Sequence, residues 1–190
     1  MKKTVLNFVL ATIIGCACCF PTFSQQLLAN HTGLKIIIIR HAEKPLKGDN
    51  LTCQGLNRSL LLPALLYSKF GIPAFTYTPS IGTGDSTKHS RMFQTIIPMA
   101  VKYNLVINSK YDELDSTGVA ADLLKKTGTV LLVWEHKAIP GIVRSLGVHD
   151  LFLKWANEDY ESIWIITFPG GVPALTKDTE GLTVSPACTF

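Results

Sequence analysis

Continuous apolar runs alternate with amphipathic stretches along most of the chain. Three runs have the length and composition of strands buried on both faces: Leu34–Ile39, Thr129–Trp134 and Ser162–Phe168. Shorter runs rich in β-forming residues predict two more strands, at Ala74–Thr78 and Leu105–Ile107.

Helical periodicity fills the intervals between these strands. It predicts helices from the N-cap Thr52 to Gly71, from about Thr87 to Val101, from about Gly118 to Lys126 and from about Ile139 to Leu146. Such alternation predicts an α/β fold, a three-layer sandwich with a mostly parallel central sheet. Pro63 is expected to bend or interrupt the first helix, and the Gly- and Pro-containing tail after Phe168 is expected to be irregular.

Ionisable residues follow two of the buried runs directly. The first run ends in Arg40-His41-Ala42-Glu43-Lys44, and the run at Thr129–Trp134 ends in Glu135-His136-Lys137. In open α/β sheets the carboxyl ends of the strands form the ligand-binding edge. A neutral imidazole can attack phosphorus once a guanidinium has gathered the phosphate oxygens, although Arg40-His41 taken alone also fits a solvated strand end.

The N-terminus has the pattern of an export signal. Met1-Lys2-Lys3 is basic, Val5–Phe20 is almost wholly apolar, and small residues at Thr22 and Ser24 predict cleavage after Ser24. Residues 1–24 are therefore interpreted as a signal peptide and residues 25–190 as one domain, exported to the periplasm or secreted. The alternative is a lipoprotein, because Ile13-Ile-Gly-Cys16 loosely resembles a lipobox. No stable membrane span is expected after signal cleavage.

Composition excludes two classes of protein. With 190 residues, 47% of them hydrophobic, the chain can bury a large core and is not a disordered protein. The net charge of +4 falls to +2 without Lys2 and Lys3, and no dense basic stripe suggests a nucleic-acid partner. Two cysteines, Cys53 and Cys188, follow the predicted signal, and they could form one disulfide or remain two thiols.

Four sequence blocks together resemble the histidine phosphatase superfamily, whose fold is phosphoglycerate-mutase-like. They are Arg40-His41-Ala42-Glu43, with Ala in the family's Gly position, Leu51-Thr52-x-x-Gly55-x-x-Arg58, Ser90-Arg91-x-x-Gln94-Thr95, and Glu135-His136. The blocks occur in the family's order. The resemblance implies that His41 is the nucleophile and becomes a phosphohistidine, and that Arg40, Arg91 and His136 hold the transferring phosphoryl group. It implies neither a metal nor another cofactor.

The proton donor is the point where the chain departs from part of the family. Some members use an Asp directly after the second histidine, where this chain has Lys137. Others use an acid in a region comparable to residues 111–113, so Asp112 is the first candidate and Glu135 the second. Burial near Trp134 could raise the pKa of Glu135 into the range that a general acid needs. Glu43, Lys44 and Arg58 are candidates for substrate binding.

The sequence thus predicts an exported, metal-independent phosphomonoesterase acting on a small-molecule or envelope sugar phosphate. The alternative is a catalytically inactive phosphoryl-binding protein of the same fold, because a pocket of two arginines and two histidines binds phosphate even without a proton donor.

Overall fold

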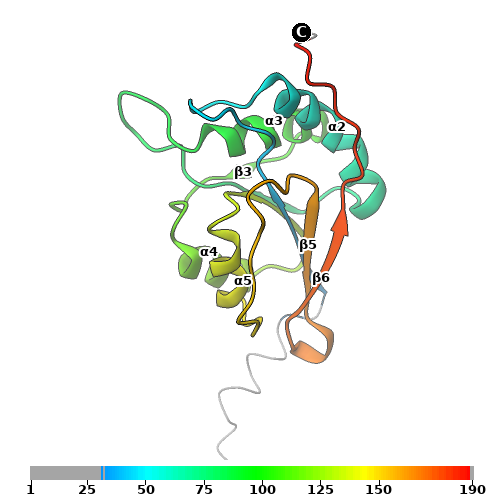
Figure 1. Ribbon diagram of the computed structural model, residues 1–190. Helices are drawn as coiled ribbons and strands as arrows, with labels where there is room; N and C mark the ends of the chain where they lie inside the picture. The colour runs from blue at the N-terminus through cyan, green and yellow to red at the C-terminus, as the bar shows by residue number, and fades with distance from the viewer. Residues whose placement is uncertain (1–30, 32, 189–190) are drawn as a thin grey trace, which may run out of the picture.

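A six-stranded mixed sheet forms the centre of the molecule (Figure 1). The computed structural model describes residue 31 and residues 33–188, so the predicted signal peptide and its cleavage site lie outside the described residues. The strands are β1 (Leu34–Arg40), β2 (Phe75–Tyr77), β3 (Ile107–Asn108), β4 (Gly128–Trp134), β5 (Ser162–Thr167) and β6 (Ala174–Thr179). Their order across the sheet is β3-β2-β4-β1-β5-β6.

Five of the six strands run in the same direction, and β5 alone runs antiparallel to them. β1 pairs in parallel with β4, and β2 pairs in parallel with both β4 and β3. β5 runs antiparallel to β1, and β6 antiparallel to β5. The start of β5 therefore lies at the edge of the sheet where β1 and β4 end, which brings the segment before β5 to the predicted ligand-binding edge.

Helices cover both faces of the sheet and complete the predicted three layers. They are α2 (Cys53–Phe70), α3 (Ser90–Tyr103), α4 (Ser116–Leu123) and α5 (Ile139–Ser145), with a 3₁₀ turn η1 (Pro169–Gly171) before β6. Figure 1 shows α2 and α3 on one side of the sheet and α4 and α5 on the other.

The isoleucine run of β1 supplies both halves of the core. Ile36 and Ile38 pack in the cluster that includes α4 and α5, whereas Ile37 and Ile39 pack in the cluster that includes α2 and α3. All four are at most 1% exposed, as the continuous apolar run predicts for a strand covered on both faces. This burial fixes the register of β1, because a slip of one residue would exchange the two core faces.

Helix α2 begins and ends where the sequence predicts. The Thr52 hydroxyl accepts a hydrogen bond from Gly55 N at 3.1 Å, and Gly71 takes the positive φ of 74° that suits glycine after a helix. The expected interruption at Pro63 is wrong, because α2 continues through it. Pro63, Leu62 and Leu66 are buried, and this packing offsets the helix hydrogen bond that proline cannot make.

The tail contains a strand that the sequence analysis expected to be irregular. β6 lies at the edge of the sheet and is mostly polar, so its sequence lacks the apolar run of the inner strands. Smaller differences affect the ends of other elements: β3 begins two residues later than predicted, and α4 ends at Leu123 rather than near Lys126. No helix among the described residues is both long enough and apolar enough to span a membrane.

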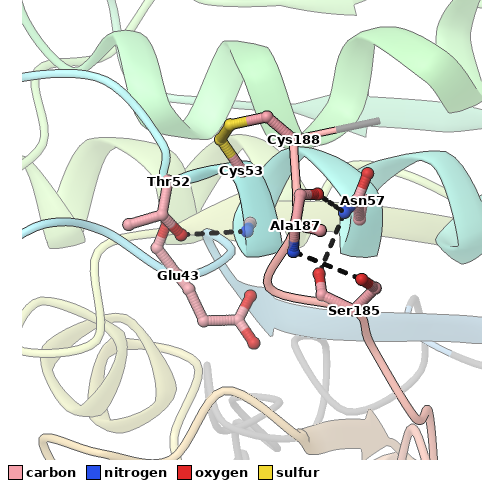
Figure 2. Close-up of a disulfide and its surroundings, with 8 residues drawn as sticks. Glu43, Thr52, Cys53, Asn57, Ser185, Ala187 and Cys188 are labelled. Atoms are coloured by element: carbon pink, nitrogen blue, oxygen red, sulfur yellow. Dashed lines mark hydrogen bonds between the residues drawn. A yellow bond between two sulfur atoms is a disulfide. The ribbon is translucent and has the colours of Figure 1, made fainter. Parts of the chain in front are cut away.

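A disulfide joins the end of the tail to the start of α2. Cys53 and Cys188 form it across 135 residues of sequence, which decides between the two alternatives that the sequence left open. Figure 2 shows the tail beside α2, where the Asn57 amide also donates hydrogen bonds to the carbonyl oxygens of Ser185 and Ala187. The C-terminal segment is thus held to the helix that follows the Arg40-His41 loop.

Candidate active site

The two histidines meet because β1 and β4 are neighbouring parallel strands. Arg40 lies opposite Trp134 in the register, and His41 N continues the ladder by donating to the Trp134 carbonyl at 3.1 Å. His136 lies two residues after the end of β4. Ligand atoms of His41, Glu135 and His136 all lie within 4.8 Å of one another.

Two cavities open around these residues. We call the first the His41 cavity; it has about 320 Å³ and is lined by His41, Asp49, Ser86, Thr87, Lys88, His89, Arg91, Met92, Glu113 and Glu135. We call the second the Tyr160 cavity; it has about 220 Å³ and is lined by Arg40, Lys44, Pro45, Leu46, His136, Lys137, Asn157, Glu158 and Tyr160. The four residues expected to hold a phosphoryl group are divided between them, His41 and Arg91 in one, Arg40 and His136 in the other.

His41 has a neutral ring with an unpartnered nitrogen. Its Nδ1 lies 2.7 Å from the Ala42 carbonyl oxygen, which can only accept, so Nδ1 carries the proton and Nε2 keeps its lone pair. The ring is 1% exposed, and Nε2 has no hydrogen-bond partner. The pKa of His41 is lowered to about 3, chiefly by burial. The hydrogen bond to Ala42 opposes this shift, and the charges of Arg40, Arg91 and His136 add to it.

Unpartnered nitrogen atoms concentrate in this site. Six buried side-chain polar atoms lack a hydrogen-bond partner among the residues that the structure describes, and four of them belong to the predicted phosphoryl-binding set: Arg40 Nε, His41 Nε2, Arg91 Nε and His136 Nδ1. Buried polar groups in folded proteins are otherwise almost always satisfied. Arg40 Nε and Arg91 Nε can donate, and His41 Nε2 has a free lone pair, so an incoming phosphate would satisfy these groups. His136 Nδ1 can donate only when the ring is protonated, because its Nε2–H points to Asn157 Oδ1.

The guanidinium of Arg40 is held by the segment before β5. Its Nη1 donates to the carbonyl oxygens of Asn157 and Asp159, and its Nη2 donates to the Tyr160 hydroxyl at 3.2 Å. The guanidinium carbon also lies 3.9 Å from the centre of the Tyr160 ring, a cation–π contact. These contacts fix the orientation of Arg40 and leave its Nε free.

His136 is held from two sides. Its Nε2 lies 3.0 Å from Asn157 Oδ1, and its Nδ1 lies 2.6 Å from Glu135 Oε1, outside hydrogen-bond geometry. Burial lowers the pKa of His136, and the charge of Arg40 lowers it as well. Asn157 therefore contacts both Arg40, through its carbonyl, and His136, through its side chain.

Arg91 lies in the first turn of α3, as the sequence predicts, and lines the His41 cavity. Its Nη2 donates to the Gly48 carbonyl, which belongs to the loop between β1 and α2. The residue before α3, His89, has a positive φ of 54°, an uncommon conformation for a residue with a side chain.

The carboxyl that faces the nucleophile from residues 111–113 is Glu113. It lines the His41 cavity, whereas Asp112 is exposed and its carboxylate accepts a hydrogen bond from Leu114 N at 3.1 Å. Burial raises the pKa of Glu113, against the opposing charge of His89, whose Nδ1 lies 2.6 Å away. The second candidate, Glu135, also lines this cavity, and its Oε2 accepts a hydrogen bond from Lys137 N.

Glu43 and Arg58, expected at the substrate, instead form a buried ion-pair group beneath the loop. Arg58 Nη2 lies 2.8 Å from Glu43 Oε1, and Arg58 Nη1 lies 2.5 Å from Glu180 Oε2. Neither Glu43 nor Arg58 is among the residues that line the two cavities. Lys44, by contrast, lines the Tyr160 cavity.

The remaining residues of the sequence blocks hold the loop between β1 and α2. Thr95 Oγ1 accepts a hydrogen bond from Ala42 N at 2.9 Å, and Gln94 Oε1 accepts one from Leu51 N at 2.9 Å. Thr52 N donates to the Glu43 carbonyl at 2.9 Å. These contacts position His41 relative to α2 and α3 without touching a ligand themselves.

One donor set could in principle hold a cation. His41, Glu135 and His136 offer two ring nitrogens and a carboxylate oxygen at close range. However, the pKa values of both histidines are lowered in part by the positive charge of Arg40, which shows that its field acts here. A field that disfavours a protonated imidazole also disfavours a metal cation, so the set suits an anion better.

Sequence reasoning missed Asn157, Tyr160 and the position of Glu113. Nothing near residues 157–160 resembles a motif, and the relevant signal is the direction of β5, which only the sheet reveals. The sequence indicated residues 111–113 as the source of an acid. It could not distinguish Glu113 from the adjacent Asp112 as the carboxyl that lines the His41 cavity.

Neither the available protein-family models nor the curated proteins match this sequence. Solved structures do match its fold. A phosphoserine phosphatase variant from Entamoeba histolytica in complex with phosphoserine matches with a TM-score of 0.54 and 14% identity, over 78% of this chain and 97% of that one.

Two further structures match in the same way. A mycobacterial glucosyl-3-phosphoglycerate phosphatase in complex with inorganic phosphate has a TM-score of 0.51 and 12% identity, over 76% of this chain and 95% of that one. The protein histidine phosphatase SixA in complex with tungstate has a TM-score of 0.50 and 15% identity, over 77% of this chain and 97% of that one.

Proposed function

We propose, from its fold and its site, that this chain is a metal-independent phosphomonoesterase acting through a phosphohistidine on His41. The chain has the phosphoglycerate-mutase-like fold of solved histidine phosphatases over about three quarters of its length. The observation that carries the proposal is the free Nε2 of a neutral, buried His41 among unpartnered nitrogens of Arg40, Arg91 and His136. Phosphoryl transfer needs mainly a positioned nucleophile and charge stabilisation of the equatorial oxygens, and these residues supply both.

The first chemical step forms a bond between His41 Nε2 and phosphorus and breaks the bond between phosphorus and the ester oxygen. The alcohol leaves with a proton from the Glu113 carboxyl, whose pKa is raised by burial. Arg40 and Arg91 donate to the phosphoryl oxygens throughout, and His136 donates through Nδ1 when the bound phosphoryl group has drawn a proton onto its ring.

The second step returns the enzyme to its starting state. Water attacks the phosphohistidine, the bond between phosphorus and nitrogen breaks, and inorganic phosphate is released. The Glu113 carboxylate takes the proton from the attacking water, so that it is again protonated for the next cycle.

Export is part of the proposal and has two supports. The N-terminal sequence has the three regions of a signal peptide, and the chain after it forms a disulfide, a bond typical of oxidising compartments. We infer that the domain acts in the periplasm or outside the cell, on a small-molecule or envelope sugar phosphate. The lipoprotein form with Cys16 is the alternative.

The second candidate function is a catalytically inactive phosphoryl-binding protein. The contact of 2.6 Å between His89 and Glu113 favours it, because an ionised Glu113 in this pair could not protonate a leaving group. Both functions use the same anion site, and they differ in whether the Glu113 carboxyl carries a proton.

The test is hydrolysis of 4-nitrophenyl phosphate by the protein from Gln25 onward, with and without a chelator. We expect turnover that survives the chelator, is lost in His41→Ala and persists in His149→Ala, which changes an exposed histidine. Rapid quenching should trap acid-labile phosphate on the wild-type protein and on His149→Ala, but not on His41→Ala. Phosphate binding without turnover or trapped phosphate would favour the inactive binder.

A further inference from the structure

The residue before α3, His89, has a backbone conformation that helix capping does not explain. Its φ of 54° and ψ of 23° lie in the left-handed region, which is unfavourable for a residue with a side chain. His89 occupies the N-cap position, yet its side chain makes no capping hydrogen bond to α3. Strained residues persist where the surrounding structure holds them, and they concentrate at functional sites.

The His89 side chain contacts the carboxyl of Glu113 instead. Its Nδ1 lies 2.6 Å from Glu113 Oε2, and the two side chains are 22% and 19% exposed. Among the residues that the structure describes, His89 is the one basic side chain in ion-pair contact with Glu113. The Trp134 indole donates to the Glu113 carbonyl oxygen at 2.8 Å. Trp134 thus fixes the backbone of Glu113, and His89 fixes its side chain.

The charges around Glu113 make this contact the favourable one for its carboxylate. Burial raises the pKa of Glu113, the charge of His89 opposes that shift, and the charges of Glu135 and Asp112 add to it. The other ionisable side chains that line the His41 cavity are those of His41, Asp49, Lys88, Arg91 and Glu135. His89 is therefore placed to compensate the negative charge that Glu113 acquires when it gives up a proton.

We propose that His89 is a positioning residue for Glu113, the general acid of the reaction. A carboxylate oxygen can only accept, so His89 Nδ1 carries the proton of this contact and holds Glu113 Oε2. The other oxygen, Oε1, is then directed to the leaving group. This inference rests on the proposed phosphatase function, and it adds a residue that lies outside the four sequence blocks.

The proton balance leaves His89 unchanged over the cycle. As the bond between phosphorus and the ester oxygen breaks, Glu113 Oε1–H gives its proton to that oxygen, and the electron pair of the O–H bond stays on the carboxylate. The Nδ1–H of His89 stabilises the carboxylate while the phosphohistidine exists. In the second step the carboxylate takes a proton from the attacking water. His89 orients the group that moves the proton, as the third member of a catalytic group does in other enzymes.

Two variants remove the imidazole and keep the backbone conformation. Asn and Gly both adopt positive φ readily, and Asn keeps an N–H donor at the place of Nδ1 whereas Gly has none. We expect His89→Gly to lower kcat for glycerol 3-phosphate about tenfold with little change in KM, and His89→Asn to restore most of this loss. Release of 4-nitrophenolate in the first turnover should slow by less than about threefold in both variants, because this leaving group needs no proton.

Asn104→Gly is the matched control for the backbone. Asn104 lies directly after α3 and also has a positive φ, of 53°, but it lines neither the His41 cavity nor the Tyr160 cavity. This variant should keep the wild-type kcat for both substrates.

A double variant tests whether His89 acts through Glu113. In the Glu113→Gln background there is no carboxyl to orient, so His89→Gly should cause little further loss of kcat for glycerol 3-phosphate. An equal loss in both backgrounds overturns the proposal. So does a wild-type kcat in His89→Gly, or a loss of the same size for glycerol 3-phosphate and for 4-nitrophenolate release, which a merely structural role would give.

A titration separates the role of His89 from the phosphatase function. NMR of the protein with isotope-labelled glutamate carboxyl carbons follows Glu113, whose signal is assigned by its absence in Glu113→Gln. In His89→Gly the pKa of Glu113 should rise, because the opposing charge of His89 is gone. If no phosphate ester is hydrolysed, the phosphatase fails, and the titration decides the contact by itself: a raised pKa supports it, and an unchanged or lower pKa overturns it.

Discussion

Gly55 of α2 packs directly against the backbone of Glu43. A Cβ at Gly55 would overlap the Glu43 carbonyl oxygen and would lie 2.9 Å from its nitrogen, closer than real side chains approach. The first turn of α2 therefore sets the path of the chain two residues after His41, and it explains why a glycine occupies this place in the second sequence block.

Gly55→Ala should consequently destabilise the protein and reduce its activity. We expect a loss of about 1–3 kcal/mol in the free energy of unfolding, because backbone atoms rather than a flexible side chain must move. Chemical denaturation measures it, and kcat for 4-nitrophenyl phosphate should fall as well. Gly84→Ala is the control, since its Cβ would meet nothing within 4 Å, and an equal loss in both variants would contradict the packing argument.

Arg58→Ala should be strongly destabilising. It would leave Glu43 and Glu180 without their shared cation, and removal of one partner from a buried ion pair typically costs about 3–5 kcal/mol. Lys69→Ala, which breaks the exposed pair with Asp178, should cost less than about 1 kcal/mol. Urea denaturation of both variants measures the difference in the free energy of unfolding. Similar losses would contradict the larger stabilisation expected of the buried Arg58 ion pairs.

Acid should destabilise the protein through His41. Its folded pKa of about 3 lies below the ordinary 6.5, so the unfolded chain binds a proton between these values that the folded chain does not. Stability should therefore fall as pH drops below about 6.5, by at most about 1.4 kcal/mol per pH unit from this group. In His41→Gln the free energy of unfolding should decline less steeply between pH 6.5 and 4. His149→Gln should keep the wild-type slope, and a wild-type slope in His41→Gln would refute a neutral His41.

Glu113→Gln should affect substrates according to their leaving groups. An alkyl alcohol needs a proton to leave, so kcat for glycerol 3-phosphate should fall about 100-fold. 4-Nitrophenolate leaves as an anion, so its release in the first turnover, which reports the first step alone, should slow less than tenfold. Asp112→Asn is the matched control, and Glu135→Gln tests the other carboxyl of the cavity. A leaving-group effect in Glu135→Gln alone would transfer the acid role to Glu135.

Reduction of the Cys53–Cys188 disulfide should destabilise the fold. Its loop of 135 residues predicts a loss of up to about 5 kcal/mol from the greater entropy of the unfolded chain. Denaturation with and without dithiothreitol, beside the double variant Cys53→Ser/Cys188→Ser, measures this loss. The double variant should not respond to dithiothreitol, and equal stability of oxidised and reduced wild type would show that the tail contributes little.

Local sequence patterns predicted most of the elements well. Thr52 and Gly71 bound α2 because a hydroxyl cap and a positive φ are local requirements that single residues meet. Pro63 misled the prediction because its local cost is outweighed by packing with Leu62 and Leu66, and β6 was missed because an edge strand needs no apolar run.

The sequence by itself determined the layers, the edge of the sheet that it predicts as the ligand-binding one, and the candidate residues Arg40, His41, Arg91 and His136 near that edge. The layers and the edge follow from the periodicity of apolar residues. The candidate residues follow from what stands at the end of a buried run or at the start of a helix, and from the four sequence blocks. Only the tertiary structure decided that Glu113 rather than Asp112 faces His41, that Arg58 pairs with buried carboxylates, and that residues 157–160 hold Arg40. Side-chain direction and the antiparallel course of β5 depend on contacts between residues far apart in the chain, and no local pattern records them.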